Sequence, residues 1–169
     1  SAKNCKNLLE DTIEAAQLRA EIGSQLKEAT KTDWESWGLQ MGYVYQNSNI
    51  CVYDDSAPPP DDYIKYIPSS YPGARAPHAW LADGRSTLDL YGDGFVLLSF
   101  SEKLAEETLN IKKIAIDLGI PFSVIQMNSS EIYKIYEFTL VLVRPDGHVC
   151  WRGEHIENPE MLLKKIAGF

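Results

Sequence analysis

The stretch from Tyr71 to Phe100 constrains the fold most, because a conformationally special segment leads directly into a buried strand. Pro72 fixes its own φ and Gly73 can adopt a positive φ, so the stretch begins as a turn. It ends in the apolar run Phe95–Leu98, which is typical of a strand that is buried on both faces. We therefore expect this run to form a strand at the centre of the core.

The chain from Phe95 onward predicts alternating strands and helices. Apolar runs of strand length are separated by helical apolar periodicity and by residues that end helices or form turns. The predicted strands cover 95–100, 121–126, 138–143 and 148–152, and the predicted helices cover 101–118, 130–136 and the region from 158 onward. This order, β-α-β-α-β-β-α, is that of the thioredoxin core. We expect an α/β fold with a thioredoxin-like core, preceded by an N-terminal helix and an extended linker segment.

Residues at the ends of these ranges support the boundaries. Ser101 is suited to cap the first helix and Gly119 to stop it. The segment Arg144–Gly147, with its Pro and Gly, predicts the turn of a hairpin. Asn158 and Pro159 match the N-cap and first position of the last helix.

The N-terminal third predicts one helix followed by extended chain. Leu9, Ile13, Ala16 and Ala20 form an apolar stripe at helical spacing, which must cover the chain's own core, meet a second copy or remain exposed. The segment 34–55 is rich in aromatic and β-branched residues and predicts one or two short strands. Aromatic residues at such density are more typical of a core than of a pocket; they are Trp34, Trp37, Tyr43, Tyr45 and Trp80.

A proline run supplies the best domain boundary. Pro58, Pro59 and Pro60 are followed by two aspartates, as in a stiff, exposed linker. We expect an N-terminal helix and extended segment over 1–57, a Pro-rich linker over 58–70 and the thioredoxin-like domain over 71–169.

Composition excludes several classes of protein. The formal net charge of -8 and the lack of a basic patch argue against a nucleic-acid partner. The apolar runs are far shorter than the ~20 residues of a membrane helix, so we expect a soluble, cytoplasmic protein without a membrane partner. Three widely spaced cysteines indicate reduced thiols. The start at Ser1 is compatible with a lost Met, a tag remnant or a piece of a longer protein.

The sequence lacks the residues that three common kinds of site need: a thioredoxin-type redox site, a dinucleotide site and a structural metal site. Thioredoxin-type redox chemistry needs Cys-x-x-Cys at the start of the first core helix, where this chain has Ser101–Leu104. A dinucleotide site needs a glycine-rich loop after a strand, whereas Gly92–Gly94 precedes one. His148, Cys150 and His155 give only a thin suggestion of a metal site, because a structural site needs four ligands at tight spacing. We therefore expect no metal and no bound cofactor.

The polar residues of the central stretch are the remaining candidates for chemistry. In a cofactor-free enzyme His78 would be a general base near neutral pH, oriented by Asp83 or Asp89. Arg75 or Tyr91 would stabilise an enolate or a phenolate. The candidate catalytic residues are thus His78, Asp83 and Arg75, and the candidate ligand-binding residues, for an aromatic small molecule, are Tyr91, Asp89 and Trp80.

A structural role for the same residues is the favoured alternative. Arg75, His78 and Asp89 would satisfy buried backbone groups of a long, nonregular segment. The sequence supplies neither an independent nucleophile nor a cofactor motif to accompany them.

Several motifs carry a resemblance to a known family. The segments PGARAPHAWL (72–81), DGRSTLDLYGDGFVLL (83–98) and LVLVRPDGHVCWRG (140–153) resemble the C-terminal region of FAD-dependent aromatic-ring hydroxylases, the phenol hydroxylase-like flavoprotein monooxygenases. The resemblance extends from about Trp37 to the end of the chain. It implies a thioredoxin-like C-terminal domain and, for the whole enzyme, hydroxylation of a phenolic or polyketide-like aromatic with FAD, NAD(P)H and O₂.

Three functions follow as hypotheses. The first is a structural, non-redox C-terminal domain, or a free-standing descendant of one, that packs on the flavin and substrate domains or associates with itself. The second is a cofactor-independent isomerase, cyclase or dehydratase that acts on an aromatic or polyketide intermediate. The third is an accessory subunit that docks on a separate flavin domain through the Leu9–Ala20 stripe.

Overall fold

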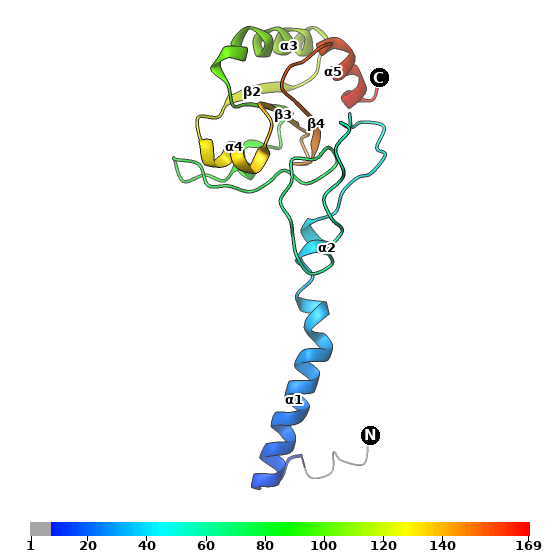
Figure 1. Cartoon of the computed structure of the whole chain (residues 1–169), viewed down its shortest axis with the longest axis vertical. Coiled ribbons are helices and arrows are strands. Elements are labelled where there is room, and N and C mark those ends of the chain that lie inside the picture. Colours follow the sequence, from blue (N-terminus) through cyan, green and yellow to red (C-terminus); the bar gives the residue numbers. More distant parts are fainter. Residues whose placement is uncertain (1–7) are drawn as a thin grey trace.

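A four-stranded mixed sheet forms the centre of the C-terminal part of the chain. The structure is a computed structural model that describes residues 8–169 (Figure 1). The strands are β1 (Phe95–Ser99), β2 (Phe122–Gln126), β3 (Leu140–Val143) and β4 (Val149–Gly153). Their order is β2-β1-β3-β4, in which β1 is parallel to β2 and β3 is antiparallel to both of its neighbours.

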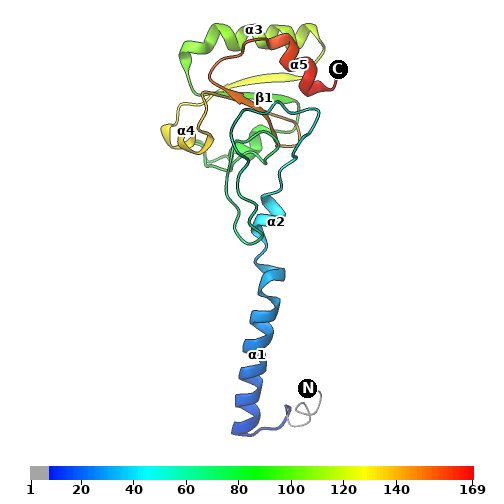
Figure 2. The same ribbon diagram turned by 45° about the vertical axis from the view of Figure 1, so that its right-hand side comes forward.

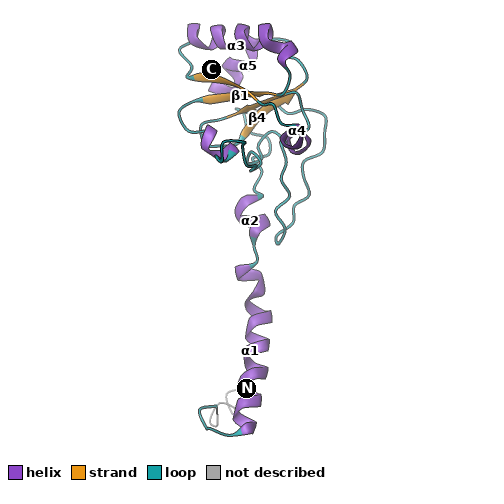
Figure 3. Cartoon of the chain, turned by 90° about the vertical axis from the view of Figure 1, so that its left-hand side faces the viewer, coloured by secondary structure: helices purple, strands orange, loops and turns teal. Residues whose placement is uncertain are grey.

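Helices cover both faces of this sheet. The helices α3 (Ala105–Asp117) and α5 (Pro159–Ala167) lie on one face, and α4 (Ser130–Tyr136) lies on the other (Figures 1 and 3). Because side chains alternate along a strand, Leu97 packs in the cluster with α3 and α5, whereas Leu98 packs in the cluster with α4. Both side chains are fully buried, which confirms the prediction of a strand buried on both faces.

The predicted order of elements from Phe95 onward is present. Ser129 Oγ accepts a hydrogen bond from the Ile132 backbone N–H at 3.3 Å, and Asn158 Oδ1 accepts one from Met161 N–H at 3.0 Å. Ser101 caps a short 3-10 segment, η3 (Glu102–Leu104), which leads into α3. The α/β class is therefore confirmed, while the assignment to the thioredoxin fold stays a prediction.

The N-terminal arm, residues 8–70, begins with a long helix that projects from the sheet. This helix, α1 (Ile13–Trp34), starts where Thr12 Oγ1 accepts a hydrogen bond from Ala15 N–H at 3.2 Å. Figures 1 and 2 show that α1 extends away from the rest of the chain. The helix predicted for the first thirty residues is thus present from Ile13; Leu9 precedes it, and 1–7 lie outside the described residues. None of the helices in 8–169 has the length and apolarity needed to cross a bilayer.

The strands predicted for 34–55 are wrong. The described structure instead has a short helix, α2 (Trp37–Met41), and a single isolated bridge between Val44 and Ala74. The bridge does not grow into a ladder because its partner segment turns at Gly73, where φ is 92°. A Cβ at that position would lie 2.4 Å from the Tyr45 carbonyl oxygen, so only glycine permits this close approach.

Candidate functional site

The segment between Gly73 and β1 is nonregular, and Ser86 organises its polar groups. Ser86 Oγ lies 2.7 Å from His78 Nδ1 and accepts a hydrogen bond from Leu88 N–H at 3.0 Å. Asp89 Oδ2 accepts from Ser86 N–H at 2.8 Å, which completes the cap of the 3-10 helix η2 (Thr87–Leu90). The His78 ring also meets the Trp80 indole edge to face, with centroids 4.9 Å apart. The structure therefore brings His78, Asp89 and Trp80 together.

Asp83 serves a separate local contact. Its carboxylate accepts hydrogen bonds from the Arg85 side chain at 2.7 Å and from the Arg85 backbone N–H at 3.0 Å. The side-chain hydrogen bond from Arg85 lowers the pKa of Asp83, and both side chains are more than half exposed. Asp83 therefore bonds to Arg85 at an exposed turn and not to His78.

Tyr91 belongs to a buried pair of phenols. Its hydroxyl lies 3.0 Å from the Tyr136 hydroxyl, which donates to the Pro77 carbonyl oxygen at 2.6 Å. Burial raises the pKa of both phenols, so both remain protonated at neutral pH. This pair joins the central stretch to α4.

Arg75 points to the N-terminal arm. Its Nη1 lies 3.6 Å from Met41 Sδ, a weak acceptor in α2, and its backbone forms an isolated bridge with His148. Burial raises the pKa of nearby Tyr66, and Arg75 lowers it by a smaller amount. The six predicted site residues thus separate into the Ser86 group and three independent contacts. Their catalytic and ligand-binding roles stay predictions.

Sequence reasoning missed a buried arginine that fastens the arm to the sheet. Arg152, in β4, donates to Asp54 Oδ2 at 2.7 Å, to Ser56 Oγ at 2.6 Å and to Ser70 Oγ at 3.0 Å. Its guanidinium also lies 4.4 Å from the centroid of the Phe138 ring, which favours a cation–π contact. Burial raises the pKa of Asp54, but hydrogen bonds from Arg152 and Ser56 outweigh it, so the pKa lies below its ordinary value. The sequence places Arg152 in a predicted strand, but it does not show the distant partners that bury its guanidinium.

The arm itself exposes many large apolar side chains. Trp34 is 79% exposed, Trp37 56% and Tyr43 60%, so the prediction that these aromatic residues belong to a core is wrong. Trp37 also lines an open hollow of about 620 Å³ together with Met41, Ile64 and Ile67. We call the exposed apolar side chains of this region the arm set: Leu9, Ile13, Leu26, Trp34, Trp37, Leu39, Tyr43, Tyr45, Tyr63, Ile64 and Ile67.

The two cysteines among the described residues do not suit redox chemistry. Cys51 and Cys150 are both buried, and burial raises the pKa of the Cys150 thiol. A reactive cysteine needs the opposite, because the thiolate is the nucleophile. Cys5, the third cysteine of the sequence, lies outside the described residues.

Neither Gly92–Gly94 nor the start of η3 and α3 suits the pyrophosphate of FAD. Gly92–Gly94 leads into β1 and is not followed by a helix. A Cβ at Gly94 would lie 2.6 Å from the Pro121 carbonyl oxygen, so this glycine serves chain packing. The start of η3 and α3 carries Glu102, Glu106 and Glu107, whose charges repel a phosphate.

His148, Cys150 and His155, which the sequence suggested weakly as metal ligands, differ in their burial. Cys150 is fully buried, His148 is half-buried and His155 is exposed, where its Nδ1 lies 3.3 Å from Glu107 Oε2. Within residues 8–169 no three His, Cys, Asp or Glu side chains are grouped as a metal site would require.

Comparison with known families gives a match over most of the chain. A sequence profile described as "Aromatic-ring hydroxylase, C-terminal" matches residues 69–168. This range contains β1–β4, α3–α5 and the whole segment from Tyr71 to Phe100.

One curated relative illustrates the similarity over the arm as well. The FAD-dependent monooxygenase apdD of Emericella nidulans is 35% identical over 164 residues, which are 91% of this chain and 26% of that protein. The chain spans about a quarter of the length of the curated relatives it matches.

Solved structures extend the similarity to three dimensions. The substrate-free rebeccamycin biosynthetic enzyme RebC gives a TM-score of 0.79 at 34% identity, over 96% of this chain and 30% of that one. The flavin-dependent monooxygenase PieE, solved with FAD and substrate, gives 0.71 at 30% identity, over 96% and 31%. The fold of the arm is therefore shared, in addition to that of the sheet.

Proposed function

Because the chain belongs to the aromatic-ring hydroxylase family, as its C-terminal domain, we propose that it is the structural, non-redox portion of an FAD-dependent aromatic monooxygenase. In this function the arm packs on the flavin- and substrate-binding portion of the enzyme. FAD held by that portion would activate O₂ for hydroxylation of an aromatic substrate, with NAD(P)H as reductant. The residues of this chain supply the packing surface.

The exposure of the arm set is the observation that carries this proposal. Apolar side chains as exposed as Trp34 and Trp37 cost free energy in water unless another surface covers them. Flavin-dependent enzymes about three times as long share the fold of 96% of this chain, and in the proposed function a portion like the rest of those enzymes covers the arm.

The non-redox part of the proposal rests on the thiols. Both described cysteines are buried, and η3 begins with Glu102 where a redox domain places its nucleophile. Treatment of the chain with a thiol-specific reagent under native conditions should therefore leave Cys51 and Cys150 unmodified, as measured by peptide mass spectrometry. Rapid modification of either would contradict the assignment.

The mass of the native protein tests the proposal directly. We would detect it in its own cells with an antibody against this chain and purify it under mild conditions. The proposal expects a band several times larger than 19.0 kDa and a yellow protein with a flavin spectrum. A colourless protein of this size that captures no flavoprotein would overturn it.

The same experiment separates an accessory subunit from a covalent domain. The exposed arm set favours docking in both cases. A band near 19.0 kDa that copurifies with a separate yellow polypeptide would establish the accessory subunit. The cofactor-independent enzyme lacks such support, because Arg75 and Asp83 make separate contacts away from the Ser86 group that holds His78.

A further inference from the structure

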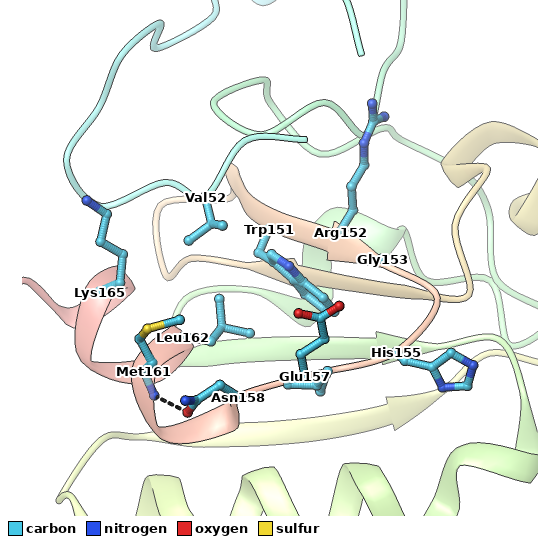
Figure 4. Close-up of a pocket in the computed structure, with 11 residues that line it drawn as sticks. Val52, Trp151, Arg152, Gly153, His155, Glu157, Asn158, Met161, Leu162 and Lys165 are labelled. Atoms are coloured by element: carbon cyan, nitrogen blue, oxygen red, sulfur yellow. Dashed lines mark hydrogen bonds between the residues drawn. The ribbon is translucent and has the colours of Figure 1, made fainter. Parts of the chain in front are cut away.

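A cavity opens beside β4, the strand at one edge of the sheet, where three segments of the chain meet. Val52 of the arm, Trp151 of β4 and Leu162 of α5 contribute apolar walls, and the volume is about 480 Å³. Figure 4 shows these side chains around the same space, with Met161 at its α5 side. Small-molecule sites commonly have volumes of this size and mainly apolar walls with few polar groups. We call it the β4–α5 cavity.

The indole of Trp151 forms one wall of this cavity, and its place is set by Gly153. It lies over Gly153, where an added Cβ would come within 2.7 Å of the Trp151 ring. Glycine at this position therefore leaves space for the ring beside the strand. An aromatic wall favours stacking with a flat ring, because aromatic pairs gain energy beyond the burial of their area.

Most of the polar groups around the cavity are already engaged elsewhere. The Arg152 side chain is directed away from it (Figure 4) and bonds to Asp54. The Nδ1 of His155 lies 3.3 Å from Glu107 Oε2. Asn158 uses its oxygen to cap α5. These contacts engage the Arg152 guanidinium and the Asn158 oxygen, whereas the N–H groups of the Asn158 amide remain free to donate to a ligand.

Two opposite charges remain at the rim. Within the described part of the chain neither Lys165 nor Glu157 forms a salt bridge, whereas the adjacent Lys164 pairs with Glu160 at 2.7 Å. In Figure 4 the Lys165 side chain lies at the α5 side of the cavity, whereas the Glu157 carboxylate lies toward the Trp151 indole. A ligand that spans it can place an anion toward Lys165 and a hydrogen-bond donor toward Glu157.

We propose that the β4–α5 cavity binds a flat aromatic molecule that carries an acid group at one end and a hydroxyl or N–H donor at the other. The aromatic ring lies against Trp151, the acid group faces Lys165 and the donor faces Glu157. The walls come from this chain alone, so binding does not require a flavin-containing portion and does not depend on the packing proposed for the arm.

The first experiment titrates the whole chain with 6-hydroxy-2-naphthoate and follows the indole N–H signals by NMR. Trp151 is identified as the signal that disappears in Trp151→Phe. The proposal expects a saturable shift of this signal and small shifts of the other three indoles. Absence of a saturable shift at millimolar probe would overturn it. A Trp151 shift that follows protein concentration without probe would indicate a second copy at this site, and would also overturn it.

Two simpler probes test the polar ends of the ligand. 2-Naphthol lacks the acid group and 2-naphthoate lacks the hydroxyl. Each should bind about threefold to tenfold more weakly than 6-hydroxy-2-naphthoate, as one charge-assisted contact is lost at a partly exposed site. Equal affinity for all three probes would show that the cavity does not select for these groups, contrary to the proposal.

A matched pair of variants tests the lysine. Lys165→Ala should weaken 6-hydroxy-2-naphthoate about threefold to fivefold and leave 2-naphthol unchanged, since an exposed ion pair contributes little more. Lys164→Ala, at the neighbouring exposed position, should leave both affinities within about twofold. Equal effects of the two variants would overturn the proposed position of the acid. Because both lysines are exposed, the pair remains decisive even if Trp151→Phe fails to fold.

Discussion

The four-stranded sheet and the arm are both rich in apolar residues, but the sheet buries them and the arm exposes them. Leu97 and Leu142 of the sheet are fully buried, whereas Trp34 and Trp37 of the arm are more than half exposed. The sheet has helices on both faces to cover its strands, but α1 projects alone (Figure 1). Apolar content therefore identifies residues that need burial, and the tertiary arrangement decides whether this chain itself provides it.

A buried ion pair joins the two regions. Arg152 reaches from β4 to Asp54 and Ser56, which precede the proline run, and to Ser70, which follows it. The ends of the predicted linker are thus attached to the sheet, while α1 and α2 extend beyond this attachment (Figure 1). The contrast between the regions can be tested at the core, at this junction and on the arm.

The largest effect is expected from a cavity in the sheet core. Leu142→Ala should lower the free energy of unfolding by about 2–5 kcal/mol, because the surrounding side chains cannot fully collapse into the space. The matched change in the arm, Leu26→Ala, should cost less than about 0.5 kcal/mol, since Leu26 is 59% exposed. Urea unfolding followed by circular dichroism measures both. Similar losses would contradict the contrast.

Removal of the buried arginine should have the next largest effect. Arg152→Met keeps the apolar stem but leaves Asp54 without its cation, and we expect a loss of about 2–3 kcal/mol. The cost lies below that of a fully buried charge because the Asp54 side chain is 26% exposed. Arg144→Met, which removes a cation from an ion pair in the β3–β4 turn, is the control and should cost less than about 1 kcal/mol.

The ion pair between Arg152 and Asp54 predicts that the free energy of unfolding depends on pH. Because the pKa of Asp54 is lower in the folded chain, its stabilisation is fully present above the unfolded value of about 4 and declines as pH falls through the folded value. The difference in unfolding free energy between the native chain and Asp54→Asn should therefore be constant near pH 7 and shrink below about pH 4. A difference that persists undiminished to pH 2 would argue against ionised Asp54 as its source.

The buried phenol pair should make a smaller contribution. Tyr136→Phe removes the hydrogen bond to the Pro77 carbonyl oxygen and should cost about 1–2 kcal/mol in urea unfolding. Tyr133→Phe is the control, because Tyr133 lies on the same helix with a 38% exposed side chain, and should cost less than about 0.5 kcal/mol.

The smallest effect on stability is expected on the arm. Trp34→Ser should change the unfolding free energy by less than about 0.5 kcal/mol, as the side chain is 79% exposed. It should nevertheless reduce concentration-dependent association of the isolated chain in sedimentation velocity, because it removes exposed apolar surface. A large loss of stability would show that Trp34 is buried within the chain, and would remove the comparison on which the proposed docking rests.

Much of the fold was predictable because local signals agreed with tertiary structure. Asn158 and Pro159 start α5 as their side-chain chemistry predicts, and Gly147 takes a φ of 79° in the β3–β4 turn. The strands predicted for 34–55 failed for a different reason. A strand needs a partner along its length, and Val44 finds one at Ala74 alone.

The candidate site was less predictable than the fold. The sequence placed His78, Asp83 and Asp89 within twelve residues, but it could not show that Asp83 bonds to Arg85 while Asp89 caps η2. Arg152 gave no local signal of burial, because its partners lie more than eighty residues away in the chain. Contacts of this kind depend on how distant segments meet.

The α/β class, the order of elements from Phe95 and the family could all be inferred before the structure, because periodicity, caps and motifs are local properties of the chain. The attachment of the arm to β4 through Arg152 and the cavity that Trp151 lines beside α5 depend on how distant segments pack. The exposure of the aromatic residues of the arm depends on the same packing. A side chain is buried only when another surface packs against it, so its burial depends on contacts between segments that are distant in the sequence.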